Sequence, residues 1–414
     1  MSNPVNRRTF LKRSAETAAA VAGLRHLPAV AAETQPATQP ALEWRNKQPT
    51  MAYAQLGRTR FMASRCVFGA AGVFKKGGDL RVLELAIERG LNYIDTCRGY
   101  GDSESAIAGL IKKHRDRLFV VSKAGHIGWP DMTIQPGQDA AAAKLYTDQL
   151  EESLRQLEVE TIDCYMVQGV EHDWIVTMDA LYEAFTKARK AGKVRFFGLA
   201  THTNVPQICE LAAKGGRHDI VMLAVNPSSL APLSPAIAMM HNAGVGVVSM
   251  KASGPIARDR AAFDGQTADL FAGQKLSAYQ RAFAYLLFRG GIDAFNSHMP
   301  NREILEENLA VPMRKLEKAA LDQIEARTLA ETQGACRHCG ACNRTCPQGV
   351  NVSGLLRCHA YARHYHEPDL ARATYAMFGE ANAAACRDCG ACRAACPASI
   401  DLPAVIRGVR AAMA

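Results

Sequence analysis

Eight of the 13 cysteines fall into two copies of the spacing C-x2-C-x2-C-x3-C-P, and this is the strongest chemical signal in the chain. Thiolates at this spacing hold iron–sulfur clusters, because closely spaced cysteines each bind a different iron of one cube. Zinc is the alternative, but it needs tetrahedral sets of four ligands and usually two separated C-x-x-C pairs. We therefore predict two [4Fe-4S] clusters. The expected ligands are Cys336, Cys339, Cys342 and Cys346 in the first motif and Cys386, Cys389, Cys392 and Cys396 in the second.

The doubled motif resembles the bacterial-type ferredoxins, in which the fourth cysteine of each run binds the other cluster. The resemblance implies that Cys396 completes the first cluster and Cys346 the second. Residues Leu355 to Ala376 have helical character, so this module is similar to the helical two-cluster modules at the ends of some redox enzymes. Basic residues near the motifs predict reduction potentials toward the upper part of the ferredoxin range, unless they form only a solvated face. They are Arg337, His338, Arg344, Arg387 and Arg393.

Three residues farther upstream have the types needed to transfer a proton to a carbonyl. Tyr100 is a candidate acid, with an unperturbed pKa of about 10. A neighbouring ammonium on Lys123 would favour its phenolate, and Asp95 would hold that ammonium in place. Taken singly, Asp95 could cap a helix, Lys123 could be a solvated charge and Tyr100 could pack in a loop. The catalytic interpretation therefore depends on the three lying together in the fold.

Short apolar runs alternate with segments of helical periodicity, which predicts repeated β-α units. Helices are expected around Leu150, Leu154 and Leu157 and around Leu181 and Phe185, where apolar residues recur at helical spacing. Eight units favour a (β/α)8 TIM-type barrel, and an open doubly wound sheet lacks its G-x-G-x-x-G fingerprint here. The eight expected strands are Cys66–Ala70, Asn92–Cys97, Leu118–Ala124, Asp163–Gln168, Val194–Ala200, Ile220–Asn226, Gly246–Ala252 and Ile292–Ser297.

From about Met51 to Ala310 the chain resembles the aldo/keto reductase family. The matching pattern is a strand ending in Asp-Thr, then Tyr-Gly with Ser-Glu opening a helix, then a strand ending in Lys. The resemblance implies catalytic roles for Asp95, Tyr100 and Lys123. The chain departs from the family at the end of the fourth strand, where it has Gln168 in place of a histidine. Glutamine can orient a carbonyl but cannot titrate, so we also consider the nearby histidines. These are His172 and His202.

The family's nucleotide site is matched only in part. The Ser-Asn, glutamine and aromatic residue that the family uses at the nicotinamide end are replaced, with Met222 and Met250 at the last two of these positions. The segment from Ser297 to Arg302 is similar to the family's phosphate-binding segment, and its arginine suits an adenosine 2′-phosphate. The resemblance thus implies that NADP(H) is a possible cofactor. The residues expected to bind it are Thr201, Asn226, Lys251, Ser297, Arg302 and Asn308.

The N-terminus has the layout of a twin-arginine export signal. Arg7 and Arg8 precede a short apolar stretch, which is far too short for a transmembrane helix, and a small-residue cleavage site follows. An amphipathic or disordered basic segment is the alternative. We therefore expect export to the periplasm by the twin-arginine route. The expected divisions are a signal peptide (1–32), a linker (33–50), the barrel (51–315), and a helical linker with the two-cluster module (316–414).

Composition narrows the class of function. Hydrophobic residues make up 48% and charged residues 21% of the 414 residues, as in globular proteins, and the net charge of +9 is scattered, which argues against a nucleic-acid partner. The favoured hypothesis is an oxidoreductase that acts on a small carbonyl or alcohol substrate and exchanges electrons through the clusters with a redox partner protein. The alternative is an electron-transfer protein whose inactive barrel serves as a docking scaffold.

Overall fold

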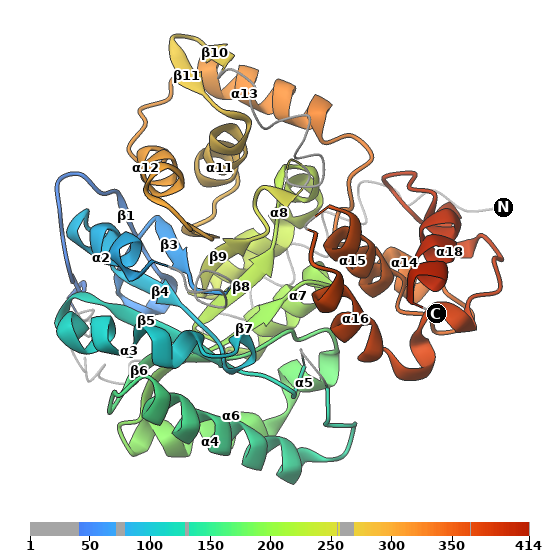
Figure 1. Cartoon of the computed structure of the whole chain (residues 1–414), viewed down its shortest axis with the longest axis horizontal. Coiled ribbons are helices and arrows are strands. Elements are labelled where there is room, and N and C mark those ends of the chain that lie inside the picture. Colours follow the sequence, from blue (N-terminus) through green and yellow to red (C-terminus); the bar gives the residue numbers. More distant parts are fainter. Residues whose placement is uncertain are drawn as a thin grey trace, which may run out of the picture. The chain divides into compact units, whose positions relative to one another are not determined.

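The computed structural model describes residues 41–71, 79–128, 132–254, 256, 269–364 and 366–413. The expected signal peptide therefore lies outside the described residues. Eight parallel strands close into a barrel in the order β12-β3-β4-β5-β6-β7-β8-β9, which confirms the predicted fold class (Figure 1). The strands are β3 Cys66–Gly69, β4 Tyr93–Asp95, β5 Phe119–Ala124, β6 Ile162–Val167, β7 Val194–Thr201, β8 Ile220–Ala224, β9 Gly246–Met250 and β12 Ala294–Ser297. Each overlaps an expected strand.

Aromatic and aliphatic side chains fill the interior of the barrel. Phe119 stacks on Phe61 with ring centroids 4.5 Å apart, and Leu56 is fully buried in the same cluster. Leu56 and Phe61 belong to an antiparallel hairpin, β1 Tyr53–Gln55 and β2 Met62–Ser64, that the sequence patterns did not reveal. Farther upstream, Arg45 pairs with the buried Asp163 at 3.1 Å, so residues within the expected linker contact the barrel.

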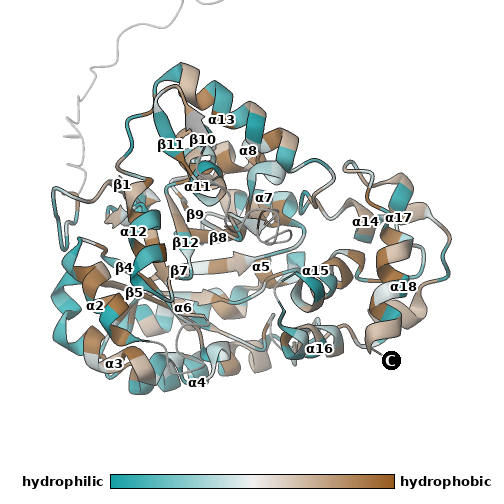
Figure 2. Cartoon of the chain, turned by 45° about the horizontal axis from the view of Figure 1, so that its top comes forward, coloured by the Kyte–Doolittle hydropathy of each residue, from teal (hydrophilic) through white to brown (hydrophobic). Residues whose placement is uncertain are grey.

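Helices surround the strands and turn their apolar sides toward them, while their outer sides are hydrophilic (Figure 2). Helix α4 buries Tyr146, Leu150 and Leu154, and α6 buries Leu181 and Phe185, as the helical spacing predicts. The helices of this part are α2 Leu80–Glu88, α3 Ser103–Lys113, α4 Asp139–Gln156, α5 Asp173–Thr177, α6 Asp179–Lys190, α7 Val205–Gly215, α8 Pro227–Asn242, α11 Ala278–Arg289, α12 Arg302–Ala310 and α13 Lys318–Glu331. A second hairpin pairs β10 Asp269–Phe271 with β11 Gln274–Leu276.

The segment from residue 335 to residue 413, which we call the cluster module, is mainly helical. Its apolar core includes Leu355, Cys358, Ile406 and Val409. The long helices α15 and α18 pack against each other, and α15 also packs on α16. The helices are α14 Ala341–Arg344, α15 Val352–Arg363, α16 Pro368–Ala376, α17 Ala391–Ala394 and α18 Leu402–Met413. Within the described part of the chain, no helix has the length and apolar character needed to cross a membrane.

A buried histidine makes the barrel sensitive to acid. His218 stacks on Phe197 at 4.9 Å, and burial together with the charges of Arg58 and Arg217 lowers its pKa from 6.5 to about 3. Between these two values the unfolded chain binds a proton that the folded chain does not, so stability falls as the pH falls through this window. From pH 7 to pH 5 the loss is about 2 kcal/mol of unfolding free energy.

We expect His218→Phe, which keeps the stacking but cannot titrate, to lose less thermal stability than the wild type between pH 7 and pH 5. The measurement is the shift in Tm between the two pH values. His241 is the matched control, because Asp293 raises its pKa and its replacement leaves the acid sensitivity in place. An equal Tm shift in His218→Phe and wild type would contradict this account.

Candidate functional site

The four expected catalytic residues lie at the carboxyl ends of neighbouring strands. Asp95 ends β4, Lys123 lies near the end of β5, and Gln168 directly follows β6. Tyr100 closes the short 3-10 helix after β4, Arg98–Tyr100. Because β4, β5 and β6 pair in parallel and in sequence, these residues meet at one end of the barrel, where side chains in this fold carry out chemistry.

Asp95 and Lys123 form a fully buried ion pair. The ammonium also donates to the carbonyl of Thr96 at 2.8 Å, and the amide of Asn296 donates to the second carboxylate oxygen of Asp95 at 2.9 Å. Burial raises the pKa of Asp95, while Lys123 and Asn296 lower it. The lysine is thus fixed on two sides. Asn296 is the second-last residue of β12. Sequence reasoning missed it, because nothing in the sequence pairs it with a residue about 200 positions away.

Tyr100 lies beside the ion pair. The ammonium nitrogen of Lys123 is 5.2 Å from the centre of its ring, within the range of a cation–π contact. Burial, followed by the charge of Asp95, raises the pKa of Tyr100 well above 10, and a side-chain hydrogen bond with Gln168 lowers it. This differs from the expectation that Lys123 favours the phenolate. Burial dominates, so the hydroxyl remains protonated at neutral pH and is suited to act as an acid.

The structure distinguishes between the two candidate histidines. His172 is exposed, stacks on Trp174 and directly precedes α5. His202 follows β7, and burial together with the charges of Arg357 and Lys251 lowers its pKa far below 6.5. His202 therefore lies near the catalytic group but is neutral at pH 7. Gln168 keeps a buried Oε1 atom without a hydrogen-bond partner among the described residues.

The side chains expected at the nicotinamide end already have other partners. Thr201 donates to the carbonyl of Thr203 at 2.9 Å, and the ammonium of Lys251 lies 5.0 Å from the ring centre of Tyr361. Asn226 caps α8, and its amide nitrogen is 3.3 Å from Nε2 of His338 in the first cysteine motif. These contacts do not fit a nicotinamide ring held by the same groups.

The residues expected at the phosphate end lie together on β12 and α12. Asn308 donates to the hydroxyl of Ser297 at 3.0 Å, and Arg302 is exposed, with Glu306 3.9 Å from its Nε atom. The residues at this end could bind a phosphate. The residues at the other end are not arranged to bind a nicotinamide ring.

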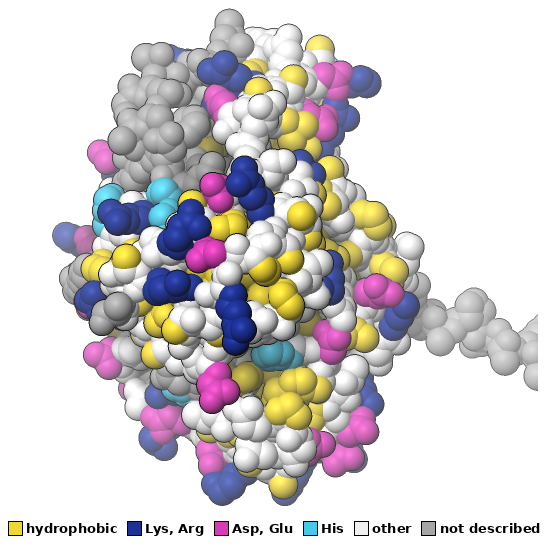
Figure 3. Space-filling model, turned by 90° about the vertical axis from the view of Figure 1, so that its right-hand side faces the viewer, with side chains coloured by type: hydrophobic (Ala, Val, Ile, Leu, Met, Phe, Trp, Pro, Cys, Tyr) yellow, Lys and Arg dark blue, Asp and Glu magenta, His cyan; other side chains and the backbone are white. Residues whose placement is uncertain are grey.

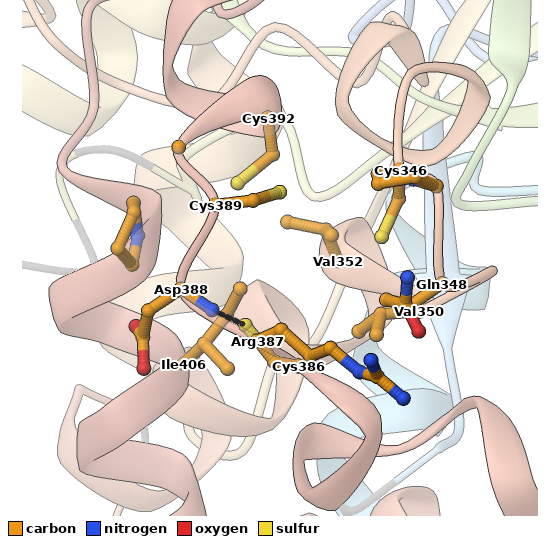
Figure 4. A pocket seen from close by; sticks show the side chains of 13 residues that line it. Cys346, Gln348, Val350, Val352, Cys386, Arg387, Asp388, Cys389, Cys392 and Ile406 are labelled. Atoms are coloured by element: carbon orange, nitrogen blue, oxygen red, sulfur yellow. Dashed lines mark hydrogen bonds between the residues drawn. The ribbon is translucent and has the colours of Figure 1, made fainter.

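The cysteines surround two hollows, each lined by three cysteines of one motif and the fourth of the other. One hollow, of about 350 Å³, is lined by Cys336, Cys339, Cys342 and Cys396. The other, of about 330 Å³, is lined by Cys386, Cys389, Cys392 and Cys346, and Figure 4 shows these side chains together with Val352, which also lines the hollow. We call them the first and second hollow. This is the grouping that the ferredoxin-type spacing implies.

The loops around the two hollows repeat the same local structure. Backbone N–H groups of His338 and Asp388 donate to the sulfurs of Cys336 and Cys386 at 3.5 and 3.4 Å. Both donors have positive φ of 52°. No three His, Cys, Asp or Glu side chains within the described ranges are arranged for a single metal ion. A cube needs no such convergence, since each thiolate binds a different iron. The two cysteine sets fit [4Fe-4S] clusters.

The loop of the first hollow contacts the barrel directly. Nδ1 of His338 lies 3.2 Å from the carbonyl of His202, and Ser228 donates to the carbonyl of Cys336, also at 3.2 Å. One tautomer satisfies both ring contacts of His338, with Nδ1 donating to His202 and Nε2 accepting from Asn226. The first hollow is thereby held at the ends of β7 and β8.

Comparisons with known proteins agree with this architecture. The sequence profile of the aldo/keto reductase family matches residues 67–327, and that of the 4Fe-4S dicluster domain matches residues 329–397. An uncharacterized oxidoreductase of Bacillus subtilis, YqkF, is 29% identical over 131 residues, which span 31% of this chain and 41% of that protein. The chain thus aligns with less than half of this relative.

Two solved structures share the fold. The aldo-keto reductase AKR11C1 of Bacillus halodurans has a TM-score of 0.55 and 19% identity, over 67% of this chain and 96% of that chain. A protein of Pseudomonas aeruginosa described as a candidate aldo-keto reductase has a TM-score of 0.50 and 21% identity, over 66% and 98% of the two chains. The protein therefore belongs to the aldo/keto reductase family and carries a 4Fe-4S dicluster domain at its C-terminal end.

Proposed function

We propose that the protein is an oxidoreductase that interconverts a carbonyl and an alcohol at Tyr100 and exchanges the electrons through two [4Fe-4S] clusters. One observation carries the proposal. The loop of the first hollow contacts the barrel at His202 and Asn226, the strand ends next to the catalytic group. This contact, at the barrel end that carries the proposed proton donor, is what supports a link between the two.

In the reductive direction the residues have separate tasks. Tyr100 donates its phenolic proton to the oxygen of the carbonyl, since burial keeps that proton in place. Lys123, fixed by Asp95, stabilises the phenolate that remains until solvent reprotonates it. Gln168 orients the substrate oxygen beside Tyr100 by hydrogen bonding.

The electron balance fits a two-cluster module. Reducing a carbonyl to an alcohol takes two electrons and two protons, one of them from Tyr100 and the other from solvent. Bound clusters each carry one electron, so two clusters hold the required pair. We propose an external one-electron carrier protein as the donor or acceptor.

The second hollow is the proposed point of exchange with that partner. Cys389 is exposed, as are Arg387, Arg393 and Arg407 around it. Lys and Arg side chains gather on the face that carries the cluster module (Figure 3). When bound, a cluster held by Cys386, Cys389, Cys392 and Cys346 would supply one-electron exchange on the side of the partner. A cluster held by Cys336, Cys339, Cys342 and Cys396 would supply it on the side of the barrel.

An inactive barrel that only holds the clusters is the second candidate. Gln168 in place of the expected histidine favours it, as do the occupied side chains of Asn226 and Lys251. The buried Asp95–Lys123 pair beside Tyr100 favours catalysis, because burying two charges is costly and a scaffold does not need them.

We further propose that the protein works in the periplasm, exported by the twin-arginine route with its clusters already bound. The support is the pair Arg7-Arg8 before a short apolar stretch. In that compartment we expect the electrons to come from the external carrier protein rather than from a soluble nicotinamide pool.

The test compares two reductants on the cluster-loaded protein under anaerobic conditions. With dithionite and a panel of small carbonyl compounds, we expect the corresponding alcohol to form. With NADPH at millimolar concentration we expect neither bleaching of the clusters nor alcohol. Alcohol formation with NADPH alone would overturn the proposed electron source, and absence of product with both reductants would favour the inactive barrel.

A further inference from the structure

Arg357, on α15 of the cluster module, has hydrogen-bond donors that no described residue uses. Its Nη1 atom donates to Glu171 at 2.6 Å, and its side chain is only 11% exposed. Its Nε and Nη2 atoms are buried and have no hydrogen-bond partner among the described residues. Leaving buried donors of a charged group unpaired is costly, so such a group is expected to serve a ligand.

The geometry of the guanidinium suits an anionic ligand with two adjacent oxygens. Nε–H and one Nη–H point the same way from one edge of the plane, and together they match the two oxygens of a carboxylate. Glu171 occupies Nη1 and so holds the guanidinium in orientation. A lysine would offer a single point charge without this fork.

Arg357 belongs to the same surface of α15 as a residue at the catalytic end. Tyr361 follows it by four residues, so both side chains lie on one helix face. Tyr361 lies against Lys251 and is close enough to Tyr100 to affect the pKa of that residue. Arg357 itself acts on His202, the neighbour of Lys123 and Lys251. Two further buried side-chain atoms have no hydrogen-bond partner in the part of the chain that the structure describes, namely Oε1 of Gln168 and Nδ1 of His202.

We infer that Arg357 binds a carboxylate of the substrate, so that the substrate is a carbonyl or alcohol compound that also carries an acid group. The inference rests on the proposed function, because only that function makes the bound compound a substrate. Binding itself requires no turnover. It also gives the cluster module a second task, because its helix α15 completes the substrate site of the barrel.

The test measures binding to the oxidised, cluster-loaded protein by calorimetry, where no reduction can occur. The probes are pyruvate, 4-oxopentanoate and 5-oxohexanoate, which differ in the separation of carbonyl and carboxylate, each compared with its neutral amide. We expect at least one acid to bind about 10- to 100-fold more tightly than its amide. No acid binding more tightly than its amide would overturn the inference.

Variants locate the binding group. Arg357→Gln is expected to remove the preference for the acid, and Arg363→Gln, an exposed arginine on the same helix, is the matched control that keeps it. Arg357→Lys retains the charge beside Glu171 and keeps the test valid if Arg357→Gln does not fold. This variant should bind the acid about tenfold more weakly than the wild type. An unchanged preference in a folded Arg357 variant would overturn the inference, whereas loss of turnover with intact acid binding would count only against the proposed function.

Discussion

Replacing Tyr100 with phenylalanine is expected to lower carbonyl turnover by about 10²- to 10⁴-fold, the usual contribution of a positioned acid. The variant removes one oxygen and keeps the ring that faces the ammonium of Lys123. The spectra of the clusters and the binding of the carboxylic acid probes should be unchanged, because neither depends on this hydroxyl. The measurement is alcohol formation by the dithionite-reduced protein.

Tyr93→Phe is the matched control. Tyr93 is also fully buried, on β4, and its hydroxyl has no hydrogen-bond partner among the described residues. Its removal should leave turnover within about twofold of wild type, since no contact is lost. If Tyr100→Phe behaves like this control on every substrate that is turned over, Tyr100 is not the acid. Because the pKa of Tyr100 is raised, its hydroxyl keeps its proton up to pH 9. Turnover should therefore not decline between pH 7 and pH 9 through loss of this proton.

Exchanging cysteines in pairs is expected to show that each cluster takes ligands from both motifs. Cys339 and Cys396 line the first hollow, so Cys339→Ser with Cys396→Ser disables only one cluster. About four irons per chain should remain. Cys339→Ser with Cys346→Ser disables both clusters and leaves almost none, because Cys346 lines the second hollow.

The measurement is iron and sulfide content after anaerobic reconstitution, with paramagnetic resonance of the reduced protein. Cys358→Ala is the control, because this buried cysteine lines neither hollow, and it should retain about eight irons. The opposite result, with more iron in the Cys339 and Cys346 pair than in the Cys339 and Cys396 pair, would mean that each motif binds its own cluster.

The sequence by itself determined the elements and much of the site. Strands buried on both faces are apolar runs, and eight of them alternating with helices leave few architectures, so the barrel could be predicted. Asp95, Lys123 and Gln168 could be placed together for the same reason, because parallel strands end on one side of a barrel. The cysteine spacing encodes a local loop, which is why it indicated clusters.

Tertiary structure alone decided which side chains contact one another. Asn226 and Lys251 look like nucleotide-binding residues until His338 and Tyr361, more than 100 positions away, are found against them. The pKa of Tyr100 depended on burial, which outweighs the neighbouring ammonium. Arg357 looked like any helical arginine. Such contacts depend on how the cluster module packs on the barrel, and packing between distant segments leaves no periodicity or spacing in the sequence.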